Sequence, residues 1–149
     1  MTSKNKEKMV QRAHHKIGII GLGHIGLPLL AVFAKKGSFV VGLDKNQERL
    51  KKIKKFKADF YEPYLDKILI RFRKKIEFTD DYGYLMKECD SVVVVVGTPL
   101  LSNNSPDFGV LDEVVNSIGK YLRHGQTIIL KSTVFPGATR KIAEKLEII

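Results

Sequence analysis

The fold of this chain is decided by residues 16–26, Lys-Ile-Gly-Ile-Ile-Gly-Leu-Gly-His-Ile-Gly. The apolar run at its start ends in glycine, which predicts a short strand that leads directly into a tight turn. Residues 24–36 then have apolar side chains at helical spacing, with Pro28 in the first turn of the predicted helix and Gly37 as its C-terminal cap. A strand, a GxGxxG turn and a helix in this order are typical of a phosphate-binding turn.

Each glycine of this turn has a separate physical task. Gly21 allows the tight turn, Gly23 lets the backbone approach a pyrophosphate, and Gly26 lets helix and strand pack closely. The helix N-terminus, which includes His24 and Ile25, adds backbone N–H groups and the positive end of a helix dipole. We therefore expect this turn to bind the phosphates of a dinucleotide. The alternative is a glycine turn shaped only by packing between helix and strand.

An acidic residue follows the second predicted strand, residues 39–43. Asp44 lies eighteen residues beyond Gly26, close to the spacing of about 20 at which a carboxylate binds the ribose of a dinucleotide. Its charge would repel a 2′-phosphate, which favours NAD over NADP as the cofactor. Lys45 and Arg49 temper that preference, because a nearby cation could accept the phosphate. Arg49 is therefore counted among the candidate cofactor-binding residues.

Strands and helices alternate along the rest of the chain. Further strands are expected at residues 76–78, 91–96 and 126–130, and further helices at 46–55, 64–72, 110–122 and 138–149. Asn46 is the expected cap of the first of these helices, and either Asp80 or Asp81 can cap one more short helix that ends at Lys87. This alternation predicts an α/β Rossmann fold, a doubly wound parallel sheet with helices on both faces.

Two further turns follow predicted strands. Ligands of open parallel sheets bind at the carboxyl ends of the strands. We therefore expect these turns in one crevice, and their candidate residues are Gly97, Thr98, Pro99, Ser132 and Thr133. For the two threonines, hydrogen bonding within their own turns is the alternative.

The composition indicates one globular domain with a basic surface. The 149 residues are 44% hydrophobic and carry a net charge of +10. Residues 51–55 are rich in lysine, which raises the alternative of nucleic-acid binding. A solvated helix face is favoured instead, because Leu50, Ile53 and Phe56 lie at helical spacing on the inward side and no aromatic and basic surface accompanies the charge. We expect no nucleic-acid partner.

Targeting signals and metal ligands are not evident in the sequence. No apolar stretch approaches the roughly 20 residues that span a bilayer, and residues 1–15 resemble a flexible basic leader rather than a secretory signal. Cys89 is the only cysteine. It permits neither a disulfide nor a metal cluster, so we expect a cytoplasmic protein without a metal site. The domain is expected at residues 16–149, and its end inside a helical pattern suggests the edge of a domain within a longer protein.

Five strings follow one another in a fixed order between residues 16 and 146. They are Gly21-Leu22-Gly23-His24-Ile25-Gly26-Leu27-Pro28, Gly42-Leu43-Asp44, Tyr61-Glu62-Pro63-Tyr64-Leu65, Val96-Gly97-Thr98-Pro99 and Ser132-Thr133-Val134-Phe135-Pro136-Gly137. In this order and spacing they resemble the UDP-glucose and UDP-N-acetylmannosamine dehydrogenase family, whose members oxidise the C6 hydroxyl of a nucleotide sugar to a carboxylate through a covalent thioester, using two NAD. Gly97 departs from the pattern, because the family usually has proline there.

The resemblance implies NAD as the cofactor and a nucleotide sugar as the substrate. Thr98 would line the cofactor site, Glu62 would lie near it, and Thr133 would act at the reacting centre by positioning a water or the substrate oxygen. The family's nucleophilic cysteine, its lysine–asparagine pair and its downstream glutamate fall beyond residue 149. The central and C-terminal substrate domains are thus expected to be absent, and this chain to bind NAD without turnover. The full-length protein is expected to be a homo-oligomer.

Two other functions stay open at this point. A dehydrogenase of the 3-hydroxyacid type could share the glycine turn, although the later Thr-Pro and Ser-Thr-Val turns argue against it. A non-catalytic nucleotide-sensing module would also bind a dinucleotide, and it would change a partner in response to NAD or NADH.

Overall fold

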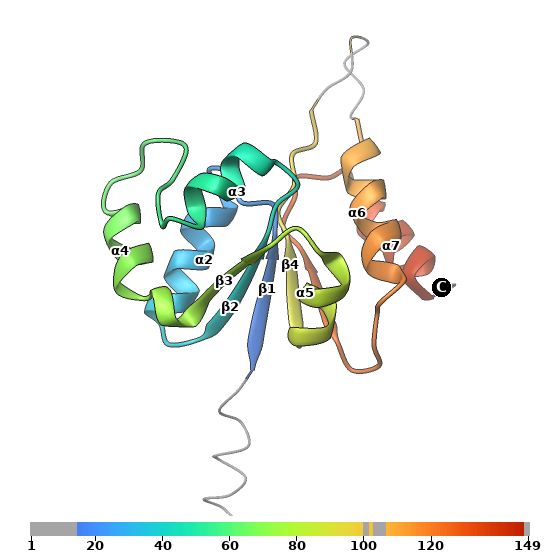
Figure 1. Ribbon diagram of the computed structural model, residues 1–149. Coiled ribbons are helices and arrows are strands. Elements are labelled where there is room, and N and C mark those ends of the chain that lie inside the picture. Colours follow the sequence, from blue (N-terminus) through green and yellow to red (C-terminus); the bar gives the residue numbers. More distant parts are fainter. Residues whose placement is uncertain (1–14, 100–101, 103–106, 148–149) are drawn as a thin grey trace, which may run out of the picture.

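The computed structural model describes residues 15–99, 102 and 107–147, and within them five parallel strands form one sheet (Figure 1). The strands are β1 (Lys16–Ile20), β2 (Phe39–Leu43), β3 (Ile76–Thr79), β4 (Ser91–Val94) and β5 (Thr127–Leu130). The helices are α2 (Gly26–Lys35), α3 (Gln47–Ile53), α4 (Leu65–Arg71), the 3-10 helix η2 (Arg73–Lys75), α5 (Tyr82–Glu88), α6 (Gly109–Gly119) and α7 (Ala138–Glu147). The predicted α/β Rossmann fold is confirmed.

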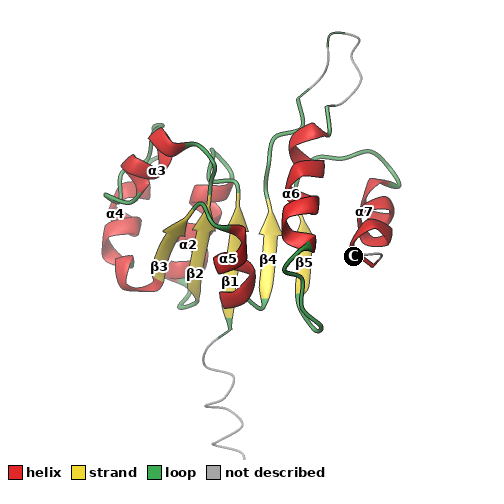
Figure 2. Cartoon of the chain, turned by 45° about the vertical axis from the view of Figure 1, so that its right-hand side comes forward, coloured by secondary structure: helices red, strands yellow, loops and turns green. Residues whose placement is uncertain are grey.

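The order of the strands in the sheet is β3-β2-β1-β4-β5. The chain moves outward from β1 through β2 to β3 and then returns to the other side of β1 as β4, so the order reverses between β1 and β4. Ile20 at the end of β1 pairs with Leu43 of β2 and with Val94 of β4. Three strands thus end at the same level, at the upper edge of the sheet in Figure 2. This reversal point is where open parallel sheets bind their ligands.

Each face of the sheet is covered by its own helices, as Figure 2 shows. Side chains alternate between the two faces along a strand. Ile19 packs in a buried cluster with residues of α2, α3 and α4, whereas Ile20 belongs to a second buried cluster with residues of α5 and α6. The glycine turn is thereby held between two packed layers. No described helix is long and apolar enough to cross a membrane.

The predicted helix ends agree with the local chemistry of the chain. The Asn46 side chain accepts a hydrogen bond from the backbone of Arg49, and Asp81 caps α5 in the same way. Gly37 has φ of +107° just beyond α2, as a C-terminal cap requires.

Several helices and strands are shorter than predicted. The structure ends β4 at Val94 rather than at residue 96, α3 at Ile53 rather than at 55, and α6 at Gly119 rather than at 122. The pattern of apolar residues continues past these ends, because apolar side chains also pack beyond the last hydrogen bond of the strand or helix. Residues 1–14 of the expected leader, residues 148–149 and most of the loop at 100–106 lie outside the described residues.

Candidate functional site

The glycine turn joins β1 to α2, and the structure separates the tasks of its three glycines. Gly21 has φ of +93°, and a Cβ there would lie 2.4 Å from the carbonyl oxygen of Val95. A Cβ on Gly26 would lie 1.7 Å from the carbonyl oxygen of Gly21. A Cβ on Gly23 would meet nothing within 4 Å. The chain itself therefore requires glycine at the first and third positions, whereas the space beside Gly23 is open to a ligand.

Asp44 is tied directly to this turn. Its carboxylate accepts the Leu22 backbone N–H at 2.8 Å and the Asn46 backbone N–H at 2.9 Å. The residue is only 8% exposed, so its side chain is fixed at the end of β2. A carboxylate has about four lone-pair sites, which leaves capacity to accept a hydroxyl hydrogen from a bound ribose.

Arg49 lies between two carboxylates. Its Nη1 donates to Asp44 Oδ2 at 3.1 Å, and its Nε donates to Asp59 Oδ2 at 3.0 Å. Burial by itself would lower the pKa of Arg49, but the hydrogen bonds and negative charges of Asp44 and Asp59 raise that pKa overall, so the guanidinium stays charged. Asp59 was not found from the sequence, because nothing in its local pattern indicates that its segment folds back onto α3.

A cleft of about 280 Å³ opens beside the turn and Asp44. Its walls come from β1, β2, α5 and α6, and they include Gly21, Asp44, Lys45, Tyr82, Val110 and Val114. Lys45 donates to the carbonyl oxygen of Asp80 at 2.8 Å, and its Nζ lies 4.7 Å from the centre of the Tyr82 ring. The cleft thus has largely apolar walls, with Lys45 and Glu113 as charged members, and a fixed carboxylate at one end, a combination suited to a nucleoside.

The two later turns are joined to each other, as the expectation of one crevice requires. The Ser132 hydroxyl accepts the Val96 N–H at 3.0 Å and donates to the Val96 carbonyl at 2.8 Å. The Thr98 hydroxyl donates to the carbonyl oxygen of Thr133 at 2.8 Å. This bond spans thirty-five residues, so the Thr98 hydroxyl is bonded across turns rather than within its own. Gly97, Pro99 and the exposed Thr133 lie in these linked segments.

His24 has an exposed side chain that stacks on Phe60, with ring centres 4.2 Å apart. Phe60 in turn packs against the cluster around α2. The ring of His24 therefore faces the segment after α3. This arrangement is consistent with a contribution to phosphate binding through the backbone N–H, as for its neighbour Ile25.

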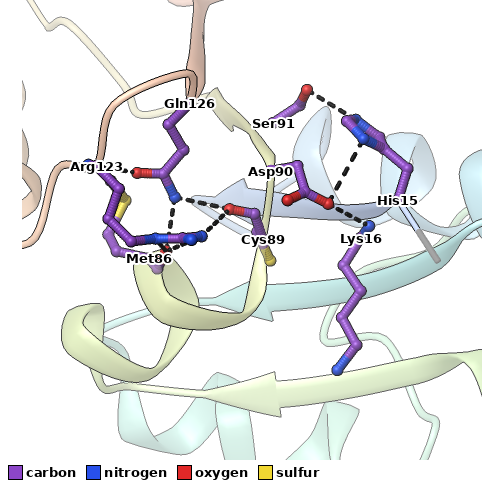
Figure 3. Close-up of polar contacts among 8 residues, drawn as sticks. All are labelled: His15, Lys16, Met86, Cys89, Asp90, Ser91, Arg123 and Gln126. Carbon is purple, nitrogen blue, oxygen red and sulfur yellow. Dashed lines mark hydrogen bonds and ion pairs between the residues drawn. The ribbon is translucent and has the colours of Figure 1, made fainter. Parts of the chain in front are cut away.

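Cys89 lies at the end of the sheet opposite the glycine turn, between α5 and the start of β4. Figure 3 shows its surroundings. Its side chain is fully buried, and burial raises the pKa of the thiol from 9.0 to about 12. Arg123 and Gln126 converge on the carbonyl oxygens of Met86 and Cys89, which caps the end of α5. Cys89 is thus a structural residue, as predicted. In the described part of the chain no three His, Cys, Asp or Glu residues gather in a possible metal site.

The start of the described chain also belongs to this end. His15 Nε2 lies 2.9 Å from Ser91 Oγ, and its Nδ1 lies 3.5 Å from Asp90 Oδ2. These contacts fasten the chain before β1 to the start of β4 (Figure 3).

Comparison with known proteins agrees with this geometry. The sequence profile of the UDP-glucose/GDP-mannose dehydrogenase family, NAD binding domain, matches residues 15–148. The chain belongs to this family. It is therefore an NAD-binding domain, and the 3-hydroxyacid alternative is not supported.

Among its relatives is the UDP-N-acetyl-D-mannosamine dehydrogenase of Pyrococcus horikoshii, 36% identical over 89% of this chain and 32% of the relative. The UDP-N-acetyl-D-glucosamine 6-dehydrogenase of Pseudomonas aeruginosa is 36% identical over 85% of this chain and 29% of its own length. The crystal structure of a ternary complex of GDP-mannose dehydrogenase from Pseudomonas aeruginosa superposes with a TM-score of 0.83 at 28% identity, over 87% of this chain and 31% of that one. This chain spans about a third of the length of these relatives.

Proposed function

We propose that this chain supplies the NAD site of a nucleotide-sugar 6-dehydrogenase, which oxidises the C6 hydroxyl of a UDP-sugar to a carboxylate. The observation that carries the proposal is the hydrogen bond from the Leu22 N–H to the Asp44 carboxylate. Asp44, the expected ribose acceptor, thereby lies beside the open position at Gly23 and at the reversal point of the sheet, which supports the proposal. Family membership supports the cofactor, and the names of the relatives support the substrate class.

The described residues fit a dinucleotide in an extended pose. Residues 21–26 would hold the pyrophosphate through the backbone N–H groups at the start of α2. Asp44 would accept a hydroxyl hydrogen of the adenosine ribose beside Arg49, and the cleft between α5 and α6 would take the adenine. Thr98 and the linked segments at Gly97, Pro99 and Ser132 would border the nicotinamide end. Bound NAD supplies the hydride acceptor for oxidation at C6.

Thr133 is the residue of this chain that we assign to the reacting centre. Its backbone carbonyl is fixed by the Thr98 hydroxyl, while the residue itself is exposed. The Thr133 hydroxyl would then position a water or the substrate oxygen next to the nicotinamide. Sugar binding and the covalent step would depend on residues outside this chain. We also propose that the complete protein is a cytoplasmic homo-oligomer.

The proposal is tested by following NAD⁺ reduction with UDP-glucose, UDP-N-acetylmannosamine and UDP-N-acetylglucosamine. The protein expressed from its complete reading frame is expected to reduce NAD⁺ with at least one of these sugars. The present chain is expected to bind NAD⁺ without turnover. Full activity of the present chain alone would contradict the assignment, as would a complete protein that oxidises hydroxyacids but no nucleotide sugar.

A further inference from the structure

Arg49 has both of its hydrogen-bonding edges engaged by carboxylates. A guanidinium presents two edges with paired N–H groups, and either edge can grip a phosphate through two parallel hydrogen bonds. Asp44 occupies a donor of the Nη1 edge at 3.1 Å, and Asp59 occupies the Nε donor of the other edge at 3.0 Å. Neither edge therefore has both of its N–H donors free for the two parallel hydrogen bonds of a phosphate.

Asp59 is held in this position by the residues on either side of it. Ala58 and Phe60 pack against the cluster around α2. The Ala58 N–H donates to Asp66 at 2.9 Å, and the Phe60 ring stacks on His24. The side chain of Asp59 is only 19% exposed. Its carboxylate therefore cannot turn away from Arg49 without disturbing packed neighbours.

The other oxygen of Asp59 points to a role beyond stability. Asp59 Oδ1 is buried and has no hydrogen-bond partner among the described residues. A buried carboxylate oxygen without a donor costs free energy, which offsets part of what the pair of Asp59 and Arg49 contributes to stability. Asp59 also changes the net charge around Arg49. Asp44, Arg49 and Asp59 together carry one net negative charge, whereas Asp44 and Arg49 alone would be neutral.

We propose that Asp59 is a specificity-determining residue that makes this site reject NADP. The inference rests on the proposed placement of the adenosine ribose at Asp44. In Rossmann domains that bind NADP, an arginine near this position accommodates the 2′-phosphate. Here Asp59 engages the Nε donor of Arg49 and adds a second negative charge next to this guanidinium, so that neither edge of Arg49 is free to grip a 2′-phosphate. Exclusion of NADP thus depends on Asp59 as well as on Asp44.

Titration calorimetry with NAD⁺ and NADP⁺ tests this role. The measured quantity is the ratio of the two dissociation constants, for the unaltered chain and for Asp59→Asn, which removes the charge at constant size. The variant is expected to lower the ratio of the NADP⁺ to the NAD⁺ dissociation constant about tenfold, mainly through tighter NADP⁺ binding. The neutral amide holds the guanidinium less strongly than the carboxylate does, so a phosphate can compete for it. Asp59→Ser provides a second variant if the first unfolds.

The matched control is Glu48→Gln, which removes the same charge one residue from Arg49. Glu48 is 78% exposed and pairs with Lys51, so the ratio should not change. Adding Arg49→Gln to Asp59→Asn should abolish the gain for NADP⁺. An unchanged ratio in folded Asp59 variants would overturn the proposal, as would equal weakening of both nucleotides or a gain that persists without Arg49. If the unaltered chain binds neither nucleotide, the proposed NAD site itself is wrong.

Discussion

Replacing Gly23 with alanine separates ligand binding from folding. Gly23 does not have a positive φ, and a Cβ there would meet nothing within 4 Å. The unfolding free energy should therefore stay the same or rise by about 0.4–1 kcal/mol, because alanine restricts the unfolded chain. A methyl group in the space that we assign to the pyrophosphate would disrupt a hydrogen bond from a backbone N–H to a charged group. Such a bond is worth about 1.5–3 kcal/mol, so the dissociation constant for NAD⁺ should rise about 10- to 150-fold.

The assay pairs calorimetric titration of NAD⁺ with a thermal melt of the same sample. Gly26→Ala is the matched comparison, because its Cβ would lie 1.7 Å from the Gly21 carbonyl oxygen and should impair folding itself. If Gly23→Ala binds NAD⁺ as tightly as the unaltered chain, the pyrophosphate does not lie beside Gly23. If Gly23→Ala melts at a markedly lower temperature, the space beside Gly23 is not open as described.

Variants at Gly26, Ser132 and Cys89 test other parts of the structure. Gly26→Ala should lose about 3 kcal/mol of stability, near the upper end of the overpacking range, and melt roughly 6–12 °C lower; an unchanged melting temperature would count against the turn geometry. Ser132→Ala should cost about 1–3 kcal/mol in urea unfolding, because it leaves the Val96 N–H and carbonyl without their partner; a neutral effect would show that this bond does not hold the two turns together. Burial raises the pKa of Cys89 from 9.0 to about 12. The stability that comes from keeping this thiol protonated in the folded state is therefore complete below pH 9 and is lost as the pH rises toward 12. Unfolding free energies measured across this range should fall less steeply for Cys89→Ala, and equal slopes would exclude a buried neutral thiol.

The order of elements could be predicted because it depends on local patterns. The alternation of apolar and polar residues, the cap at Asn46 and the glycine at residue 37 all depend on neighbouring residues. The sequence offered Asp80 or Asp81 as the cap of α5, and the structure has Asp81 there. The same holds for the turn at residues 21–26 and for Asp44, whose separation along the chain reflects one crossover between adjacent strands.

Contacts between distant segments were only partly predictable. Parallel strands bring the turns at Thr98 and Thr133 to one edge, but their hydrogen bond depends on side-chain geometry that spacing does not contain. The pairing of Arg49 with Asp59 depends on the path of the segment after α3, where Phe56 has φ of +57°. A positive φ at a phenylalanine has no clear sequence signal, so the second carboxylate beside Arg49 could not be foreseen.

Amide chemical shifts of the isotope-labelled chain, followed during titration with NAD⁺, report which residues bind the nucleotide. The largest saturable shifts are predicted at residues 21–26, at Asp44 and in the linked segments at Thr98 and Thr133. Shifts confined to the lysine-rich surface of α3, or no saturable shifts at millimolar NAD⁺, would contradict the assignment of this crevice as the NAD site.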